Sequence, residues 1–231
     1  MTSYTAAREE MLRTIEEECR YTRGLTGKVR LSARVMAAMG KVAREEFVPQ
    51  AMRPNAYDNS PLPIGNGQTI SQPFIVGLMT DLLDPEADDV ILEIGAGSGY
   101  QAAILAELVK EVHTIEIIPT LAREAAARLQ RLGYTKASVE EGDGYQGLPE
   151  HAPYDGIIVT AAAPHIPPPL IAQLKPGARL VIPVGRPHSP QALLVITKDE
   201  AGLLHEKEVL AVSFVPFTGE GQRVKGVDFS E

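Results

Sequence analysis

The 231-residue sequence contains no tryptophan, a single cysteine (Cys19) and few aromatic residues, which make up 5% of the chain. One cysteine cannot form an intramolecular disulfide, so a disulfide-stabilised secreted scaffold is excluded and a reducing compartment is expected. Cys19 lies at helical spacing from Met11 and Ile15, which favours a small buried side chain over a catalytic nucleophile.

Basic residues and long apolar runs are also scarce. Lysine and arginine number 22 against 30 aspartates and glutamates, which gives a formal net charge of −8. No basic block is present to bind a nucleic-acid backbone, and no apolar run approaches the ~20 residues of a membrane-spanning helix. The first residues lack the pattern of a secretory signal. We therefore expect a cytoplasmic, monomeric protein that binds neither nucleic acid nor membranes.

Residues 89–100, with the sequence DVILEIGAGSGY, combine a short apolar segment with three closely spaced glycines. Val90 to Ile94 has the length of a buried strand, and residues 101–108 are typical of a helix. Three glycines permit a sharp turn and let a ligand approach the backbone, because a Cβ would block it: Gly95, Gly97 and Gly99. This strand, turn and helix are typical of the start of a nucleotide-binding βαβ unit.

The glycine spacing separates two kinds of cofactor site. Dinucleotide-binding folds use G-x-G-x-x-G, whereas here the third glycine comes one residue earlier. Glu116 ends the next predicted strand, about 20 residues past the turn, where an acidic side chain can accept both hydroxyls of a ribose. The combination resembles motif I and the acidic position of class I S-adenosylmethionine-dependent methyltransferases.

The remaining apolar segments predict an α/β fold. We expect a doubly wound, Rossmann-like sheet of about seven strands, mostly parallel with an antiparallel strand near the C-terminus, plus N-terminal helices. Strands are expected at 90–94, 111–116, 137–141, 154–160, 179–184, 191–197 and 206–215, and helices at 6–21, 32–47, 72–83, 101–108, 121–132 and 167–174. Gly24 and Gly27 are expected to break the first helix. Residues 56–73, rich in Pro, Gly, Asn and Ser, predict an ordered loop held by apolar side chains.

Three further stretches resemble the protein-L-isoaspartate O-methyltransferase family. They are PLPIGNGQTISQP at 61–73, GDGYQG at 142–147 followed by APYD at 152–155, and TAAAPHIP at 160–167 followed by QLKPG and PVG. The likeness runs from about Val35 to Thr218. It departs at Leu148, where the family usually has an aromatic residue or valine, and at Ala43, where a proline is common.

The resemblance implies a repair reaction on damaged proteins and peptides. The enzyme would transfer methyl from S-adenosyl-L-methionine to the α-carboxyl of an L-isoaspartyl residue, with D-aspartyl residues as a further candidate acceptor, and release S-adenosyl-L-homocysteine. The ester would close to a succinimide that reopens to aspartate. Residues 1–50 would form an N-terminal helical segment and residues 51–231 the catalytic domain, within one compact unit.

The same resemblance assigns the site residues. Ser71 would be the catalytic residue. The cofactor would be bound by Gln68, Thr69, Ile70, Ser71, Gly95, Ala96, Gly97, Ser98, Glu116, Ile117, Asp143, Gly144, Thr218 and Gln222. The acceptor peptide would contact Pro63, Ile64, Ser71, Ala162, Ala163 and His165, mainly through its backbone, in a groove between residues 61–73 and 161–169.

The chemistry of a carboxylate acceptor agrees with these residue types. A carboxyl group with a pKa near ~4 is ionised at neutral pH, so no general base is required. Thr69, Ser71 and Gln72 are neutral donors that can align the oxygen with the methyl group while water is excluded. No His, Cys or carboxylate residues have metal-ligand spacing, so we predict no metal; His113 is expected to be packed in its strand and His151 to be solvated.

Three alternatives differ from the repair enzyme in what they would bind or transfer. A class I methyltransferase with a small-molecule acceptor would share only the cofactor half. A non-catalytic module would bind the cofactor without transferring methyl. An enzyme that transfers a hydride is disfavoured by the position of the third glycine.

Overall fold

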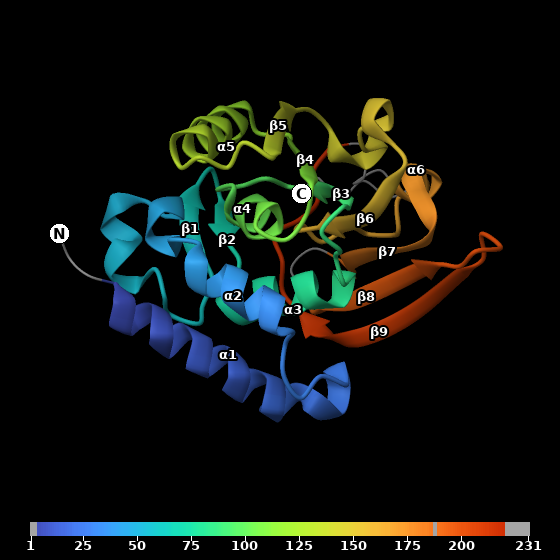
Figure 1. Cartoon of the computed structure of the whole chain (residues 1–231). Helices are drawn as coiled ribbons and strands as arrows, with labels where there is room; N and C mark the ends of the chain where they lie inside the picture. The colour runs from blue at the N-terminus through green and yellow to red at the C-terminus, as the bar shows by residue number, and fades with distance from the viewer. Residues whose placement is uncertain (1–3, 187–188, 220–231) are drawn as a thin grey trace.

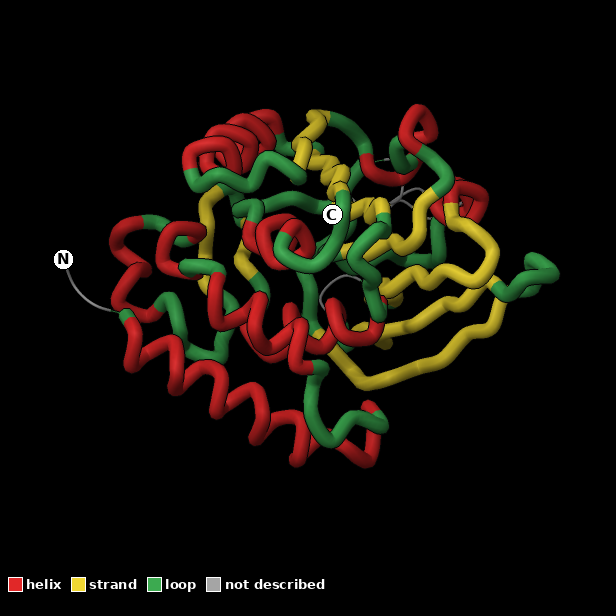
Figure 2. Tube along the Cα trace, in the orientation of Figure 1, coloured by secondary structure: helices red, strands yellow, loops and turns green. Residues whose placement is uncertain are grey.

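The computed structural model describes residues 4–186 and 189–219. The chain forms a seven-stranded sheet in the order β5-β4-β3-β6-β7-β8-β9 and a separate two-stranded hairpin, β1-β2 (Figures 1 and 2). The sheet strands are β3 (Val90–Ile94), β4 (Glu111–Glu116), β5 (Ala137–Glu141), β6 (Tyr154–Val159), β7 (Leu174–Val184), β8 (Gln191–Lys198) and β9 (Leu204–Val212). Strands β3 to β7 pair in parallel, and β8 is antiparallel to both neighbours. The predicted fold class is confirmed.

Helices cover both faces of the sheet. The α-helices are α1 (Thr5–Thr26), α2 (Ala33–Lys41), α3 (Pro73–Leu83), α4 (Tyr100–Ala106), α5 (Pro119–Arg131) and α6 (Pro168–Gln173), and the 3-10 helices are η1 (Arg44–Phe47), η2 (Gln50–Asn55), η3 (Gly144–Gln146) and η4 (Pro149–His151). Helices α1, α2 and α3 contact one another and lie together in Figure 1. Within the described residues, no helix combines the length and the apolar character needed to cross a membrane.

The core divides along the two faces of the sheet. Ile91 of β3 packs with residues of α1 to α5 in one buried cluster, whereas its neighbour Leu92 packs with Leu170 of α6 in another. This division follows from the strand period of two, because successive side chains point to opposite faces. Both clusters are dominated by Ile, Leu, Val and Ala, which explains how a chain without tryptophan forms a large core.

The first helix is longer than predicted. It continues through Gly24 to Thr26 and ends at Gly27, whose φ of 71° and N–H bond to the Arg23 carbonyl form a left-handed cap. The expected break at Gly24 was therefore wrong. A glycine inside a helix costs only about 1 kcal/mol, and burial of Met11, Ile15 and Cys19 along the helix exceeds that cost. The prediction for Cys19 as a buried side chain is confirmed.

The second predicted helix is divided. Ser32 caps α2 by accepting a hydrogen bond from the N–H of Val35, as its sequence position indicated. The helix ends at Lys41, Val42 is extended, and residues up to Phe47 form the separate 3-10 helix η1.

Residues 56–73 contain regular structure that the sequence interpretation missed. Strands β1 (Leu62–Gly65) and β2 (Gln68–Ile70) form an antiparallel hairpin. The turn residues Asn66 and Gly67 have φ of 52° and 71°, the left-handed pair that Asn-Gly favours in two-residue hairpins. The expectation of a loop without strands was wrong, because the Asn-Gly turn signal was outweighed by the high Pro and Gly content of the segment.

Candidate active site

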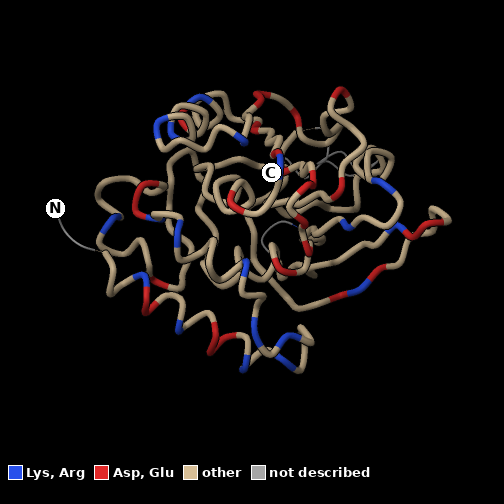
Figure 3. The backbone as a smooth tube through the Cα atoms, in the orientation of Figure 1, with Lys and Arg blue, Asp and Glu red and all other residues tan. Residues whose placement is uncertain are grey.

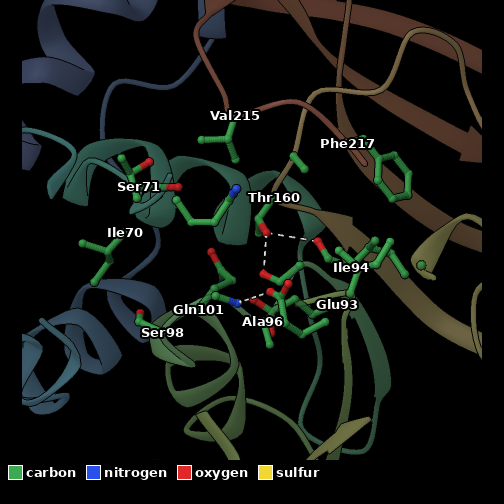
Figure 4. A pocket seen from close by; sticks show the side chains of 18 of the residues that line it. Ile70, Ser71, Glu93, Ile94, Ala96, Ser98, Gln101, Thr160, Val215 and Phe217 are labelled. Carbon is green, nitrogen blue, oxygen red and sulfur yellow. Dashed lines mark hydrogen bonds between the residues drawn. The ribbon is translucent and has the colours of Figure 1, made fainter. Parts of the chain in front are cut away.

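A narrow cavity, about 80 Å³ in volume, opens where the carboxyl ends of β3, β4 and β6 meet (Figure 4). This edge of a parallel sheet is where ligands bind in doubly wound folds. The structure brings together there most residues that the sequence suggested for the cofactor: Gln68, Thr69, Ile70, Ser71, Gly95, Ala96, Gly97, Ser98, Glu116, Ile117, Gly144 and Thr218. Gln222 lies outside the described residues.

The glycine turn has a conformation that other residues rarely adopt. Gly95, Gly97 and Gly99 have φ of 97°, 50° and 85°. A Cβ on Gly95 would lie 2.6 Å from Oγ1 of Thr160. The Thr160 hydroxyl is directed at the carbonyls of Ile94 and Gly95, at 3.0 and 2.7 Å, which ties the ends of β3 and β6 together (Figure 4).

Glu116 is held by the backbone of the same turn. Its Oε2 accepts the N–H of Gly97 at 2.8 Å and its Oε1 accepts the N–H of Ile118 at 3.0 Å. The side chain is buried. Each carboxylate oxygen has about two lone-pair sites, so both keep an acceptor site beyond these bonds. Two fixed acceptors on one buried carboxylate suit a pair of ligand hydroxyls.

Asp143 and Gly144 follow β5. A Cβ on Gly144 would lie 2.4 Å from the Ile94 side chain, so only glycine fits against the end of β3. Asp143 caps η3 by accepting the N–H of Tyr145 at 3.0 Å, and it does not line the cavity. Its carboxylate lies beside Gly219, where an added Cβ would be 2.5 Å away.

A second and wider cavity, about 830 Å³ in volume, adjoins the first. Its walls come from α1, the hairpin, α3, Ser189 and Pro190, and residues 210–215. Thr69, Ser71, Thr160 and Val215 line both cavities. Figure 4 labels the side chains of Ser71, Thr160 and Val215 among those that line the first cavity. A hydroxyl at Ser71 thus reaches a ligand in either cavity.

Buried Arg44 fixes the backbone at Ser71. Its Nη2 donates to the Ser71 carbonyl at 2.7 Å, and its Nε donates to the Ala56 carbonyl at 2.7 Å. The guanidinium also lies over the Tyr100 ring, 4.7 Å from its centroid. Sequence reasoning missed Arg44, because nothing local marks a charged residue of a polar helix as buried.

Glu93 is a second residue that the sequence interpretation did not assign. It lines the first cavity, is fully buried, and neither of its carboxylate oxygens has a hydrogen-bond partner within the described residues. Burial raises the pKa of Glu93 from its ordinary value of 4.5 to about 8. A carboxyl inside an otherwise apolar strand was the available signal, since an unpaired buried acid costs stability unless a ligand uses it.

Several predicted acceptor contacts lie outside both cavities: Pro63, Ile64, Ala162, Ala163 and His165. Ala162 exchanges backbone hydrogen bonds with Val215 and Phe217, so it positions the segment that lines the cavities. His165 Nε2 lies 3.2 Å from the Tyr145 hydroxyl. Ala162 therefore supports the lining segment without lining either cavity itself.

The junction of the cavities offers hydroxyls and no base. Glu18 of α1 is the one ionisable side chain among the described residues that line the second cavity, and it accepts a 3.4 Å hydrogen bond from Asn59. No imidazole or amine lines either cavity within that part of the chain. The arrangement suits an acceptor atom that has already lost its proton.

Comparison with known proteins identifies the family to which the chain is similar. The family model described as protein-L-isoaspartate(D-aspartate) O-methyltransferase matches residues 23–222. A protein-L-isoaspartate O-methyltransferase 2 from Syntrophobacter fumaroxidans is 58% identical over 216 residues, which cover 94% of this chain and 87% of that protein. Another from Nitrosococcus oceani is 61% identical over 211 residues, covering 91% and 96%.

Solved structures agree on the fold. A protein-L-isoaspartate O-methyltransferase superposes with a TM-score of 0.79 at 26% identity, covering 93% of this chain and 67% of that one. A Plasmodium falciparum structure, described as the same kind of enzyme in complex with S-adenosyl-L-homocysteine, gives a TM-score of 0.73 at 21% identity and covers 94% and 99%.

Proposed function

The chain belongs to the protein-L-isoaspartate(D-aspartate) O-methyltransferase family, and on that premise we propose how its site carries out the family reaction. The reaction is methyl transfer from S-adenosyl-L-methionine to the α-carboxyl of an isoaspartyl residue in a damaged protein or peptide. The methoxy group of the resulting ester leaves more readily than a carboxylate oxygen. The neighbouring amide nitrogen therefore attacks the ester carbonyl, releases methanol and closes a succinimide, which water reopens to aspartate. We take the first cavity as the cofactor site and the second as the acceptor site.

The residues of the first cavity fit this cofactor, which carries a cationic sulfur, an ammonium group and two ribose hydroxyls. Glu93 offers two buried, unpartnered carboxylate oxygens, which a cation would satisfy. Glu116 offers fixed acceptors for the ribose. Gly95, Gly97 and Gly144 let the chain pack closely around the cavity, because a Cβ on each would meet Thr160, Ile64 or Ile94, respectively. When bound, the cofactor supplies a methyl group activated for displacement.

The observation that carries the proposal is the position of Ser71, which lines both cavities with no base beside it. An acceptor carboxylate with a pKa near ~4 arrives ionised, so the site has to orient the oxygen and exclude water. Ser71 is the donor we assign to that oxygen. A cationic clamp would stabilise the carboxylate before reaction and slow transfer, and no Lys or Arg lines either cavity within the described residues.

The second cavity suits a peptide. Its lining contains Phe74, Leu210 and Phe214 beside the end of the edge strand β9, which fits recognition of an extended chain of varied sequence. Residues Glu18 and Thr22 of α1 belong to the same lining. The N-terminal helical segment, which we propose spans residues 1–50, thus contributes to acceptor binding by the domain proposed for residues 51–231.

We extend the proposal to the surroundings of the enzyme. The net charge of −8 and the alternation of both charge signs along α1 and β9 (Figure 3) disfavour binding to nucleic acid. A single buried cysteine fits a reducing, cytoplasmic setting. A monomer is proposed, and its mass in solution would test that assignment.

The test compares Ser71→Ala with Ser60→Ala. Ser60 lies in the same segment, residues 56–73, and lines neither cavity. Labelled methyl transfer is measured to matched peptides that contain isoaspartate or aspartate. We expect Ser71→Ala to lower kcat/KM for the isoaspartyl peptide about 10- to 100-fold, because one hydrogen bond to a charged group contributes about 1.5–3 kcal/mol. Cofactor affinity and the Ser60→Ala rate should stay at the wild-type level.

Three outcomes would contradict the proposal. An unchanged rate in Ser71→Ala would remove Ser71 from the reaction. Label in a small carboxylate or amine but in neither peptide would favour a small-molecule methyltransferase, and cofactor binding without any transfer would indicate a binding module.

A further inference from the structure

Three potential metal ligands gather outside both cavities, on β4, β5 and η4. Among residues 4–186 and 189–219, His113, Glu140 and His151 form a group whose ligand atoms all lie within 4.8 Å of one another. Their separation in sequence gave no metal-binding spacing. The pairing of β4 with β5, and the return of η4 over them, brings them together.

His113 presents one ring nitrogen to this group. Its Nδ1 lies 3.1 Å from the Ser138 hydroxyl, which itself lies 3.5 Å from the Val112 carbonyl. When the hydroxyl donates to that carbonyl, its oxygen can accept a hydrogen bond from Nδ1–H. Nε2 lies 3.2 Å from Oε1 of Glu111, and a bound ion would replace that contact and take the Nε2 lone pair. Such a hydrogen bond from behind is how metal-binding histidines are commonly oriented.

His151 and Glu140 complete the group from positions that can adjust. The His151 ring stacks on the His113 ring with centroids 3.9 Å apart and planes inclined by 14°. Its Nε2 lies 3.2 Å from Oε1 of Glu140. The side chain of His113 is 6% exposed and those of His151 and Glu140 are 40% and 34% exposed. The lone pair of a ring nitrogen lies in the plane of its ring, so two stacked rings cannot both point at one ion between them, and the exposed His151 must rotate to share an ion with His113.

We propose that His113, Glu140 and His151 form a Zn²⁺ site with a water molecule as the fourth ligand. Two imidazoles and a carboxylate are a donor set that zinc accepts in tetrahedral geometry. Glu111, whose Oε1 lies 3.2 Å from His113 Nε2, adds a second negative charge near the ion. Zinc would replace the stacking contact between the His113 and His151 rings by coordination bonds, which would join η4 to the sheet.

The site braces a segment that reaches the cofactor cavity. Gly144 lines that cavity, and Asp143 is the N-cap of η3. Both residues precede η4 by a few positions in the chain. A bond from His151 to the sheet would restrict this segment from its far end. The effect of zinc is therefore structural, and we expect it in thermal stability and not in the chemical step.

The experiment uses the full-length chain after removal of metal by a chelator. Isothermal titration with ZnCl₂ should give one site per chain, and zinc should raise the melting temperature as binding to the folded state requires. His151→Asn and Glu140→Gln change exposed ligands, and each should weaken zinc binding at least tenfold and lose most of the thermal shift. His205→Asn is the matched control, because His205 is exposed and has a carboxylate partner, Asp199, at 2.8 Å, but no third ligand among the residues that the structure describes.

Two results would contradict the proposed zinc site. Zinc affinity in His151→Asn and Glu140→Gln equal to that of the wild type would show that zinc binds elsewhere, and absence of zinc uptake by the wild type would overturn the site outright. Equal melting temperatures of the metal-free proteins would show that the variants fold normally. Methyl transfer measured in parallel stays independent of this outcome.

Discussion

The two adjoining cavities are built in different ways. The first, about 80 Å³, is lined by residues at the ends of neighbouring parallel strands, among them the positive-φ glycines Gly95 and Gly97. The second, about 830 Å³, is walled by side chains from α1, the hairpin, α3 and the segment after β9. In the function proposed above, the first cavity binds one invariant ligand, whereas the second accepts damaged peptides of many sequences. We therefore expect single substitutions to have large effects on the first and graded effects on the second.

The largest effect is expected at Gly95. Gly95→Ala places a Cβ 2.6 Å from Thr160 Oγ1 at a φ of 97°, so it combines backbone strain of about 1–2 kcal/mol with displacement of the hydroxyl that joins β3 to β6. Cofactor affinity, measured by titration calorimetry, should fall about 100-fold.

Gly133→Ala is the control for strain alone. Gly133 has a φ of 83°, and a Cβ there would meet nothing within 4 Å. It should lower the melting temperature without changing cofactor affinity. Equal affinity losses in both variants would mean that the first cavity has no special need for close backbone approach.

A smaller effect is expected at Glu93. We expect Glu93→Gln to weaken cofactor binding about tenfold, because a hydrogen bond to a charged group contributes about 1.5–3 kcal/mol. Glu124→Gln, on the exposed face of α5, should bind as the wild type does. Unchanged binding in Glu93→Gln would remove the cation-binding role from this carboxylate.

Glu93 also predicts a pH dependence of stability in the cofactor-free protein. Its pKa is about 8 in the folded chain against an ordinary 4.5, so between these values the folded state holds a proton that the unfolded state has released. The stability contribution is fully present below pH 4.5 and is lost as pH rises to about 8, at up to about 1.4 kcal/mol per pH unit. Urea unfolding of Glu93→Gln should show a flatter profile over this window; an identical profile would contradict the assignment.

The smallest effect is expected on the wall of the second cavity. Glu18→Gln removes its one ionisable side chain within the described residues. Two isoaspartyl peptides are compared, one with Lys and one with Glu next to the isoaspartyl residue. The kcat/KM of the Lys peptide divided by that of the Glu peptide should fall about two- to fivefold in Glu18→Gln, since exposed charge pairs contribute about 0.2–1 kcal/mol. Glu9→Gln, exposed on the same helix and outside the cavity, should leave the ratio unchanged. A ratio that does not move in Glu18→Gln would place the peptide away from α1.

The strands and the cofactor turn could be predicted because their signals are local. An apolar run followed by glycines identified β3 and its turn, and the strand-terminal position of Glu116 was correct. The hairpin carried an equally local signal in Asn66-Gly67 that was outweighed by the Pro and Gly content around it. The extension of α1 through Gly24 was missed because tertiary burial decides whether a helix tolerates a glycine.

The acceptor side was less accessible to prediction. Ser71 was assigned through the family resemblance, but the assigned neighbours Ala162 and His165 lie outside the cavities. Glu18, Phe214 and Arg44 contribute from 27 or more positions away in sequence from Ser71. No spacing rule connects such residues, because their proximity follows from strand order and helix docking. The same reason hid the group formed by His113, Glu140 and His151.

The sequence by itself determined the sheet, the glycine turn, the acidic residue at the end of β4 and the family. Each of these depends on short runs of residues whose periodicity or backbone freedom is a local property. Only the tertiary structure decided which hydroxyl joins the two cavities, which buried charges lack partners and which histidines face one another. Those features depend on distances between segments that the chain brings together only when the parallel strands pair and the helices cover them.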